Sequence, residues 1–135
     1  MNYFLDTNIC VAAMNGRPAG VAERIADKVA QGHVVAISTI VLFELQYGVA
    51  KSKQVEKNAR TLSVFLQPLL IVPFDAEDAQ MSGELRAALE RQGEPIGPYD
   101  YLIAAQALRT EFVLVTANMK EFERVPNLRR ENWIA

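Results

Sequence analysis

The sequence predicts an α/β fold with a mostly parallel central sheet. Short β-rich runs alternate along the chain with longer segments of helical pattern, which is the arrangement of βα units. The chain has 135 residues, of which half are hydrophobic and 22% are charged, the size and balance of one ordinary globular domain. We therefore expect residues 1–135 to form a single domain without repeats or linkers.

The first strand and helices are expected close to the N-terminus. The apolar run over 2–5 predicts a strand, and it ends at Asp6, a residue type that caps helices well. A helix would then begin at Thr7. A second helical pattern covers 20–32, where Gly32 is placed to end it.

The middle of the chain continues the alternation. The run "HVVAIS" over 33–38 predicts a strand, and Ser38 is placed to start the helix expected over 39–52. A further helical pattern spans 55–69, and "LIVPF" over 70–74 predicts the next strand. This order places each helix between two strands, as a parallel sheet requires.

The last third begins with a helix expected over 75–93, from Asp75 to a stop at Gly93. A loop punctuated twice by Gly and Pro, "RQGEPIGP", leads to a helix that starts at Gly97-Pro98 and covers 98–110. Three segments then complete the chain: a strand over 112–116, the helical "MKEFER" over 119–124 and the closing "LRRENWIA" over 128–135.

Composition excludes several classes of function. The net charge of −2 argues against a broadly basic nucleic-acid coat, and no apolar stretch reaches the roughly 20 residues of a membrane span. Because the N-terminus lacks the pattern of a signal peptide and Cys10 has no partner cysteine, we expect a cytoplasmic protein with no membrane contact. The single His33 makes a Ser/His/Asp triad a poor candidate. Hydrolysis would therefore depend on carboxylates and a metal.

Polar residues from four distant segments are expected at one edge of the sheet. Ligands of open α/β sheets bind outside the carboxyl ends of the strands. Asp6 ends the first strand, and Thr116 and Asn118 follow a later one. The helices that carry Glu44 and Asp100 both start from this edge. Three carboxylates and an amide would thus converge.

Each of these residues also has a purely structural interpretation. Asp6 and Asn118 can be helix caps, and Asp100 can be a first-turn acid that interacts with the helix dipole. Glu121 is either a solvated helix residue or an outer carboxylate that reaches the same cleft. Glu44 is different, because it lies in a helix that is apolar on nearly every side, where an unpaired carboxylate is costly.

A divalent cation explains why the carboxylates would share an edge. Crowded carboxylates repel one another unless a cation neutralises them. Oxygen ligands favour Mg²⁺ or Mn²⁺, whereas zinc prefers His and Cys. A metal-activated water that attacks a phosphodiester is the chemistry that such a site predicts.

The motifs resemble those of a known family over essentially the whole chain. "LDTNI", "ISTIVLFELQYGVAKS", "VPFD", "PIGPYDYLIAAQAL" and "LVTANMKEFERVPNLRRENW" occur in this order. They are similar to the PIN-domain ribonucleases and, more narrowly, to VapC toxins of bacterial type II toxin-antitoxin modules. The resemblance implies a three-layer α/β/α sandwich and Mg²⁺- or Mn²⁺-dependent endonucleolytic cleavage of RNA.

The resemblance also assigns roles to individual residues. The family's three metal-binding acids correspond to Asp6, Glu44 and Asp100, and Thr116 corresponds to a threonine that helps to hold the site. Asn118 occupies a position where many PIN domains carry a fourth aspartate, and Glu121 could supply the missing charge.

Partners and alternatives follow from the same comparison. The family implies tRNA, cut in the anticodon stem-loop, as the leading substrate and mRNA as the second. It implies a homodimer, a VapB-type antitoxin whose C-terminal segment enters the acidic cleft, and operator DNA bound only through that antitoxin. Two other classes remain open: a phosphatase with Asp6 as nucleophile, although Asn8 stands where such enzymes typically carry a second Asp, and a non-catalytic binding module.

Overall fold

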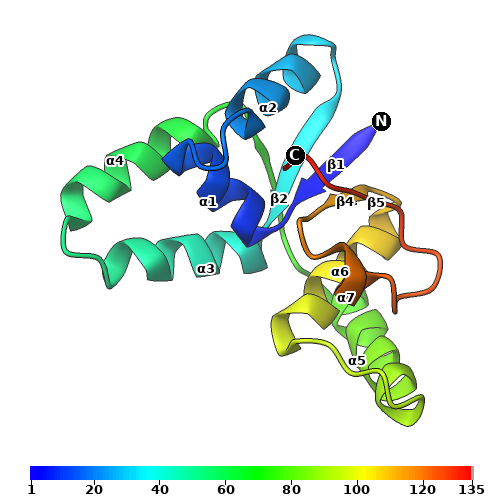
Figure 1. Cartoon of the computed structure of the whole chain (residues 1–135). Helices are drawn as coiled ribbons and strands as arrows, with labels where there is room; N and C mark the ends of the chain where they lie inside the picture. The colour runs from blue at the N-terminus through cyan, green and yellow to red at the C-terminus, as the bar shows by residue number, and fades with distance from the viewer. Residues whose placement is uncertain (135) are drawn as a thin grey trace.

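A five-stranded, all-parallel sheet forms the centre of the computed structural model, which describes residues 1–134 (Figure 1). The strands lie in the order β3-β2-β1-β4-β5. Their bounds are β1 Asn2–Leu5, β2 Val34–Ser38, β3 Leu70–Val72, β4 Val113–Val115 and β5 Arg130–Glu131. The predicted α/β fold is confirmed, and every pairing in the sheet is parallel.

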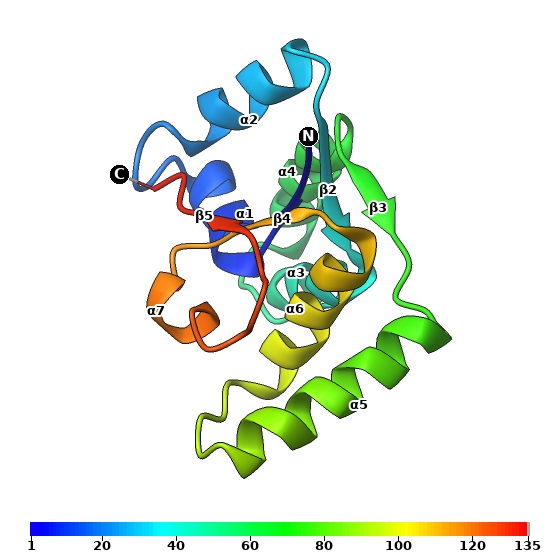
Figure 2. The ribbon, with the colours of Figure 1, turned by 90° about the vertical axis from the view of Figure 1, so that its right-hand side faces the viewer.

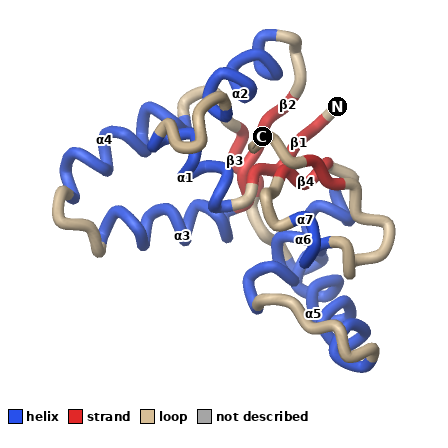
Figure 3. Tube along the Cα trace, in the orientation of Figure 1, coloured by secondary structure: helices blue, strands red, loops and turns tan. Residues whose placement is uncertain are grey.

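Helices cover both sides of this sheet. They are α1 Thr7–Asn15, α2 Val21–Ala30, α3 Thr39–Ala50, α4 Val55–Leu66, α5 Ala76–Arg91, α6 Pro98–Thr110 and α7 Met119–Phe122. Helices α1, α3 and α4 lie on one side, and α5 and α6 lie on the other, as Figures 1 and 2 show from two directions. The resulting three layers agree with the α/β/α sandwich expected from the sequence, and Figure 3 shows the strands enclosed between the helices.

The predicted helix starts are confirmed by their hydrogen bonds. The Ser38 hydroxyl accepts the Ile40 N–H at 3.0 Å at the start of α3. Asp75 and Asp78 form a reciprocal capping box at the start of α5. Pro98 is the first residue of α6, where its missing N–H costs nothing.

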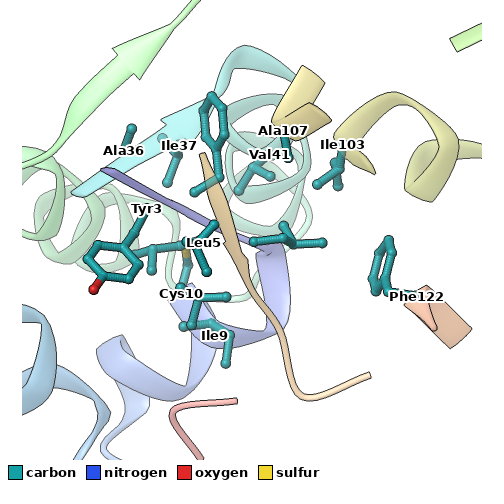
Figure 4. Packing of buried hydrophobic residues seen from close by; sticks show 14 of the residues in the cluster. Tyr3, Leu5, Ile9, Cys10, Ala36, Ile37, Val41, Ile103, Ala107 and Phe122 are labelled. Carbon is teal, nitrogen blue, oxygen red and sulfur yellow. The ribbon is translucent and has the colours of Figure 1, made fainter. Parts of the chain in front are cut away.

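The core lies between the central strands and the helices that cover them (Figure 4). Strands β1 and β4 are buried on both faces, which explains their continuous apolar sequences. Cys10 is buried in this core, and burial raises the pKa of its thiol well above the usual range. Trp133 is also buried, and its ring packs edge-on against Tyr3 at a centroid distance of 5.1 Å.

Helix α3 departs from its predicted environment. Its apolar sequence predicts burial on nearly every side, yet Phe43 is 54% exposed and Tyr47 is 59% exposed. The reason is tertiary: α3 and α4 extend away from the sheet as a paired arm (Figure 1), so part of α3 faces no other element. An apolar sequence on nearly every side of α3 thus does not mean that every side of the helix is buried.

An ion pair that the sequence did not predict joins α5 to α6. Asp78 is fully buried, and Arg109 binds both of its carboxylate oxygens. The pair joins the last turn of α6 to the first turn of α5, two helices that pack against each other. In the described chain, no helix combines the length and apolar character needed to cross a bilayer.

Candidate active site

The carboxyl ends of β1 and β4 bring Asp6 and Thr116 together. Leu5 and Val115 are paired in register, and the Asp6 N–H donates to the Val115 carbonyl at 3.0 Å. Asp6 and Thr116 are therefore the first residues beyond two adjacent strands. Both are buried, and the Thr116 hydroxyl hydrogen-bonds to the Asp6 carboxylate.

Asp6 caps α1 and also faces the other acids. Its Oδ1 accepts the Ile9 N–H at 3.0 Å, which confirms the capping interpretation. Burial raises the pKa of Asp6, and the nearby negative charge of Glu44 raises it further, while hydrogen bonds from Thr116 and Ile9 oppose the rise. The Asp6 carboxylate therefore both caps α1 and belongs to the acid cluster, by which we mean Asp6, Glu44, Asp100 and Glu121.

Glu44 is held by the residue that follows Asp6. The Thr7 hydroxyl donates to Glu44 Oε1 at 2.8 Å across the contact of α1 with α3. This bond gives the half-buried carboxylate a partner, as its apolar surroundings require. The sequence predicts either a partner or a metal beside Glu44, and Thr7 supplies a hydrogen-bond partner.

Glu121 links the end of β4 to the start of α6. Its Oε1 accepts the Gly97 N–H at 3.1 Å, and its Oε2 accepts a hydrogen bond from the Asn118 side-chain amide. The Asn118 backbone N–H in turn donates to the Thr116 hydroxyl at 3.0 Å. Glu121 is therefore not simply solvated. Asn118 stands at the N-cap position of α7, as the sequence suggested, but its side chain makes no capping bond to that helix.

Asp100 completes the cluster from the first turn of α6. Burial, a hydrogen bond with Glu121, and the negative charges of Glu121, Asp6 and Glu44 together raise its pKa to about 7. Asp100 therefore keeps its proton to a higher pH than an ordinary aspartate, whose pKa is 3.8. Glu121, Asp6 and Glu44 are thus close enough to Asp100 for their charges to affect its ionisation.

Gly97 leaves the space in which the Asp100 carboxylate lies. A Cβ atom at position 97 would stand 2.8 Å from Asp100 Oδ2, closer than such atoms approach in proteins. From the sequence, Gly97 was recognised only as the start of a helix. Its second role depends on how the first turn of α6 folds back, for which the sequence contains no separate signal.

The donor set fits a hydrated divalent cation. Within residues 1–134, no salt bridge neutralises Asp6, Glu44, Asp100 or Glu121. Over the same residues, no three acidic, His or Cys side chains form a ready-made metal cage. Mg²⁺ suits such an open arrangement, because it keeps several waters and binds through few direct carboxylate ligands.

Comparison with known proteins agrees with this geometry. Residues 3–128 match the PIN domain family model. Ribonuclease VapC2 of Rickettsia felis is 49% identical over 98% of both chains. The chain belongs to the VapC ribonucleases of the PIN-domain family. Another VapC relative, the tRNA(fMet)-specific endonuclease VapC of Shigella flexneri, is 41% identical over 98% of both chains.

A solved VapC structure has the same fold. In the crystal structure of VapBC2 from Rickettsia felis bound to a DNA fragment from their promoter, one chain superposes with a TM-score of 0.92 and 47% identity. The match covers 98% of this chain and 99% of that one. The family and fold implied by the sequence motifs are therefore confirmed.

Proposed function

We propose that the chain, as a single PIN domain over 1–135, is a divalent-metal-dependent endoribonuclease. The observation that carries this proposal is the acid cluster at the sheet edge. Four carboxylates from four segments lie together without a salt-bridge partner in the described chain. Burial first, and then the hydrogen bond with Glu121 and the negative charges of the other three acids, raise the pKa of Asp100 to about 7. Such an edge favours a cation.

Asp6, Glu44 and Asp100 would hold Mg²⁺ or Mn²⁺, either directly or through bound waters. When bound, the ion supplies an activated water and offsets the charge that develops on the phosphate. The protein's own contribution is positioning: Thr116 orients Asp6, and Thr7 orients Glu44. These hydroxyls act on the acids rather than on the substrate.

Asn118 and Glu121 position the remaining acid. Glu121 joins the Gly97 backbone to the Asn118 amide and hydrogen-bonds with Asp100. Loss of the proton from Asp100 leaves the full negative charge of the cluster available to the cation. Asn118 and Glu121 therefore influence cleavage through the position and proton affinity of Asp100.

The proposed substrate is tRNA, cut within the anticodon stem-loop so that translation stops. The name of the Shigella flexneri relative, which is 41% identical over 98% of both chains, supports tRNA over mRNA. Loop nucleotides suit a cleft of this kind because unpaired bases can be splayed apart, whereas a paired stem cannot.

The proposed partner is a VapB-type antitoxin. The Rickettsia felis neighbour was solved as a VapBC2 complex on promoter DNA, and this supports a toxin whose contact with operator DNA runs through the antitoxin. We further propose that the chain forms a homodimer and acts in the cytoplasm, where its RNA substrate is found.

Incubation of purified, antitoxin-free protein with total tRNA tests the activity. We expect new 5′ ends in one anticodon loop with Mg²⁺ and none with EDTA. Asp6→Asn should abolish cleavage while the protein stays folded. The matched control is Asp27→Asn, which alters an exposed acid on α2 and should cleave normally. Cleavage that persists in EDTA would exclude the metal, and phosphate trapped on Asp6 would indicate a phosphatase instead.

A further inference from the structure

Three exposed aromatic rings stand beside the acid cluster. Phe43 and Tyr47 lie on α3, and Tyr99 lies in the first turn of α6 and is 46% exposed. The rings of Phe43 and Tyr99 approach to a centroid distance of 6.0 Å. Large apolar rings that gather on a surface mark an interaction site more often than scattered ones do.

The three rings and one of the acids, Glu44, line the same groove. Glu44 and its partner Thr7 belong to the wall that also contains the three rings. Tyr99 immediately precedes Asp100 in the chain. A ligand that lies on the rings is therefore in the same groove as Glu44, and where it touches Tyr99 it is one residue along the chain from Asp100.

Positive charge borders the rings. Phe43 and Tyr47 on α3 and Lys51, the residue that caps the end of α3, are spaced four residues apart and so lie on one face. The Lys51 ammonium lies 4.8 Å from the centre of the Tyr47 ring. Lys53 and Lys57 are exposed further along the same arm, and within residues 1–134 none of these three lysines forms a salt bridge.

We propose that Phe43, Tyr47 and Tyr99 form a stacking platform for unpaired RNA bases next to the bond that is cut. Exposed aromatic rings flanked by cations are the features that bind single-stranded nucleic acid: the rings stack on bases, and the cations contact the phosphate backbone. Lys51 contacts a phosphate adjacent to the stacked base. This inference deepens the proposed ribonuclease function and rests on it.

Binding is measured separately from cleavage. All variants are made in the Asp6→Asn background, and the probe is a short single-stranded RNA with the fluorescent adenine analogue 2-aminopurine at one position in each oligonucleotide. Stacking on an aromatic ring quenches this base. We expect quenching at one or two positions. Tyr47→Leu and Tyr99→Leu should each relieve quenching and weaken binding by about 5-fold to 150-fold.

Matched variants distinguish stacking from general apolar contact. Tyr47→Phe and Tyr99→Phe keep the ring and should keep both quenching and affinity, whereas the leucine variants keep apolar area without a flat face. Val64→Ala removes an apolar side chain that is 65% exposed on α4, away from the groove, and should change neither reading. Unchanged quenching and affinity in both leucine variants would overturn the proposal.

Two further measurements separate this proposal from the ribonuclease function on which it rests. Cleavage of tRNA by the protein with Asp6 intact tests the ribonuclease function alone. If that protein cleaves but the leucine variants bind RNA normally, the platform is wrong and the ribonuclease stands. If it neither binds nor cleaves RNA, both fail. Light scattering on each variant tests whether the rings instead contact a second protein chain. A changed oligomeric state with unchanged RNA binding would assign the rings to such a contact and overturn the proposal.

Discussion

Gly97→Ala should impair cleavage without unfolding the protein. The backbone at Gly97 has a φ of −60° and a ψ of 150°, values that alanine adopts freely, so the substitution introduces no backbone strain. The added methyl group instead meets the Asp100 carboxylate. The perturbation therefore acts on one proposed metal ligand.

The size of the effect follows from the contact distance. The new Cβ would lie 2.8 Å from Asp100 Oδ2, whereas ordinary contacts begin at 3.4 Å. The oxygen must therefore retreat by about 0.6 Å, and the flexible end of the side chain can do so. Because a misplacement of about 1 Å can cost about a hundredfold in rate, we expect kcat/KM to fall by roughly 10-fold to 100-fold.

The assay compares Mg²⁺-dependent tRNA cleavage and thermal unfolding in two glycine variants. Gly83→Ala is the control, because Gly83 is exposed within α5 and a Cβ there meets nothing within 4 Å. It should leave cleavage intact and stabilise the fold by about 0.5–1 kcal/mol. If Gly97→Ala cleaves at the wild-type rate, the proposed dependence on the Asp100 position is refuted.

Three further outcomes are expected. Since the pKa of Asp100 is about 7 instead of its usual 3.8, Mg²⁺ must displace a proton, and calorimetry should show affinity rising about tenfold from pH 6 to pH 8. A Mg²⁺ affinity that does not change with pH would contradict this expectation. Without metal, the folded state binds the extra proton, so the free energy of unfolding should fall as pH rises from about 4 to about 7. Arg109→Met leaves Asp78 buried and unpaired and should cost about 3–5 kcal/mol in urea unfolding, whereas Arg86→Met, which breaks an exposed pair with Glu90, should cost less than about 1 kcal/mol. Asn118→Asp places two carboxylates against each other and should slow tRNA cleavage. The double variant Asn118→Asp with Glu121→Gln restores a donor and an acceptor and should recover part of the rate. No recovery would mean that the hydrogen bond between these two residues does not control the rate.

The sequence predicted best where local chemistry and topology agree. The strand over 2–5 and the helix over 98–110 match β1 and α6 residue for residue. The first is a continuous apolar run that ends at a capping aspartate, and the second begins with Gly-Pro. The convergence of Asp6, Glu44 and Asp100 followed from topology, since parallel strands end at a common edge.

The sequence could not predict which side chains would be exposed or would meet once the helices packed together. The apolar sequence of α3 does not reveal that Phe43 and Tyr47 are exposed or that their helix belongs to an arm that extends past the sheet. Likewise, Asp78 and Arg109 are 31 residues apart on different helices, and each alone is typical of a solvated helix surface. Which charged residues meet inside the fold depends on how α5 packs on α6.

Asn118 is uncharged, yet it helps to place a carboxylate at the sheet edge, because its side-chain amide binds Glu121. An aspartate at position 118 could add charge but could not donate a hydrogen bond, whereas the Asn118 amide donates to Glu121. That bond and the Gly97 N–H hold both oxygens of Glu121 in place near Asp100. The fourth carboxylate at this edge thus comes from α7 instead of from the end of β4. Burial raises the pKa of Asp100 most, and the hydrogen bond and negative charge of Glu121 raise it further, so the position of Glu121 influences how readily Asp100 releases the proton that a cation must displace.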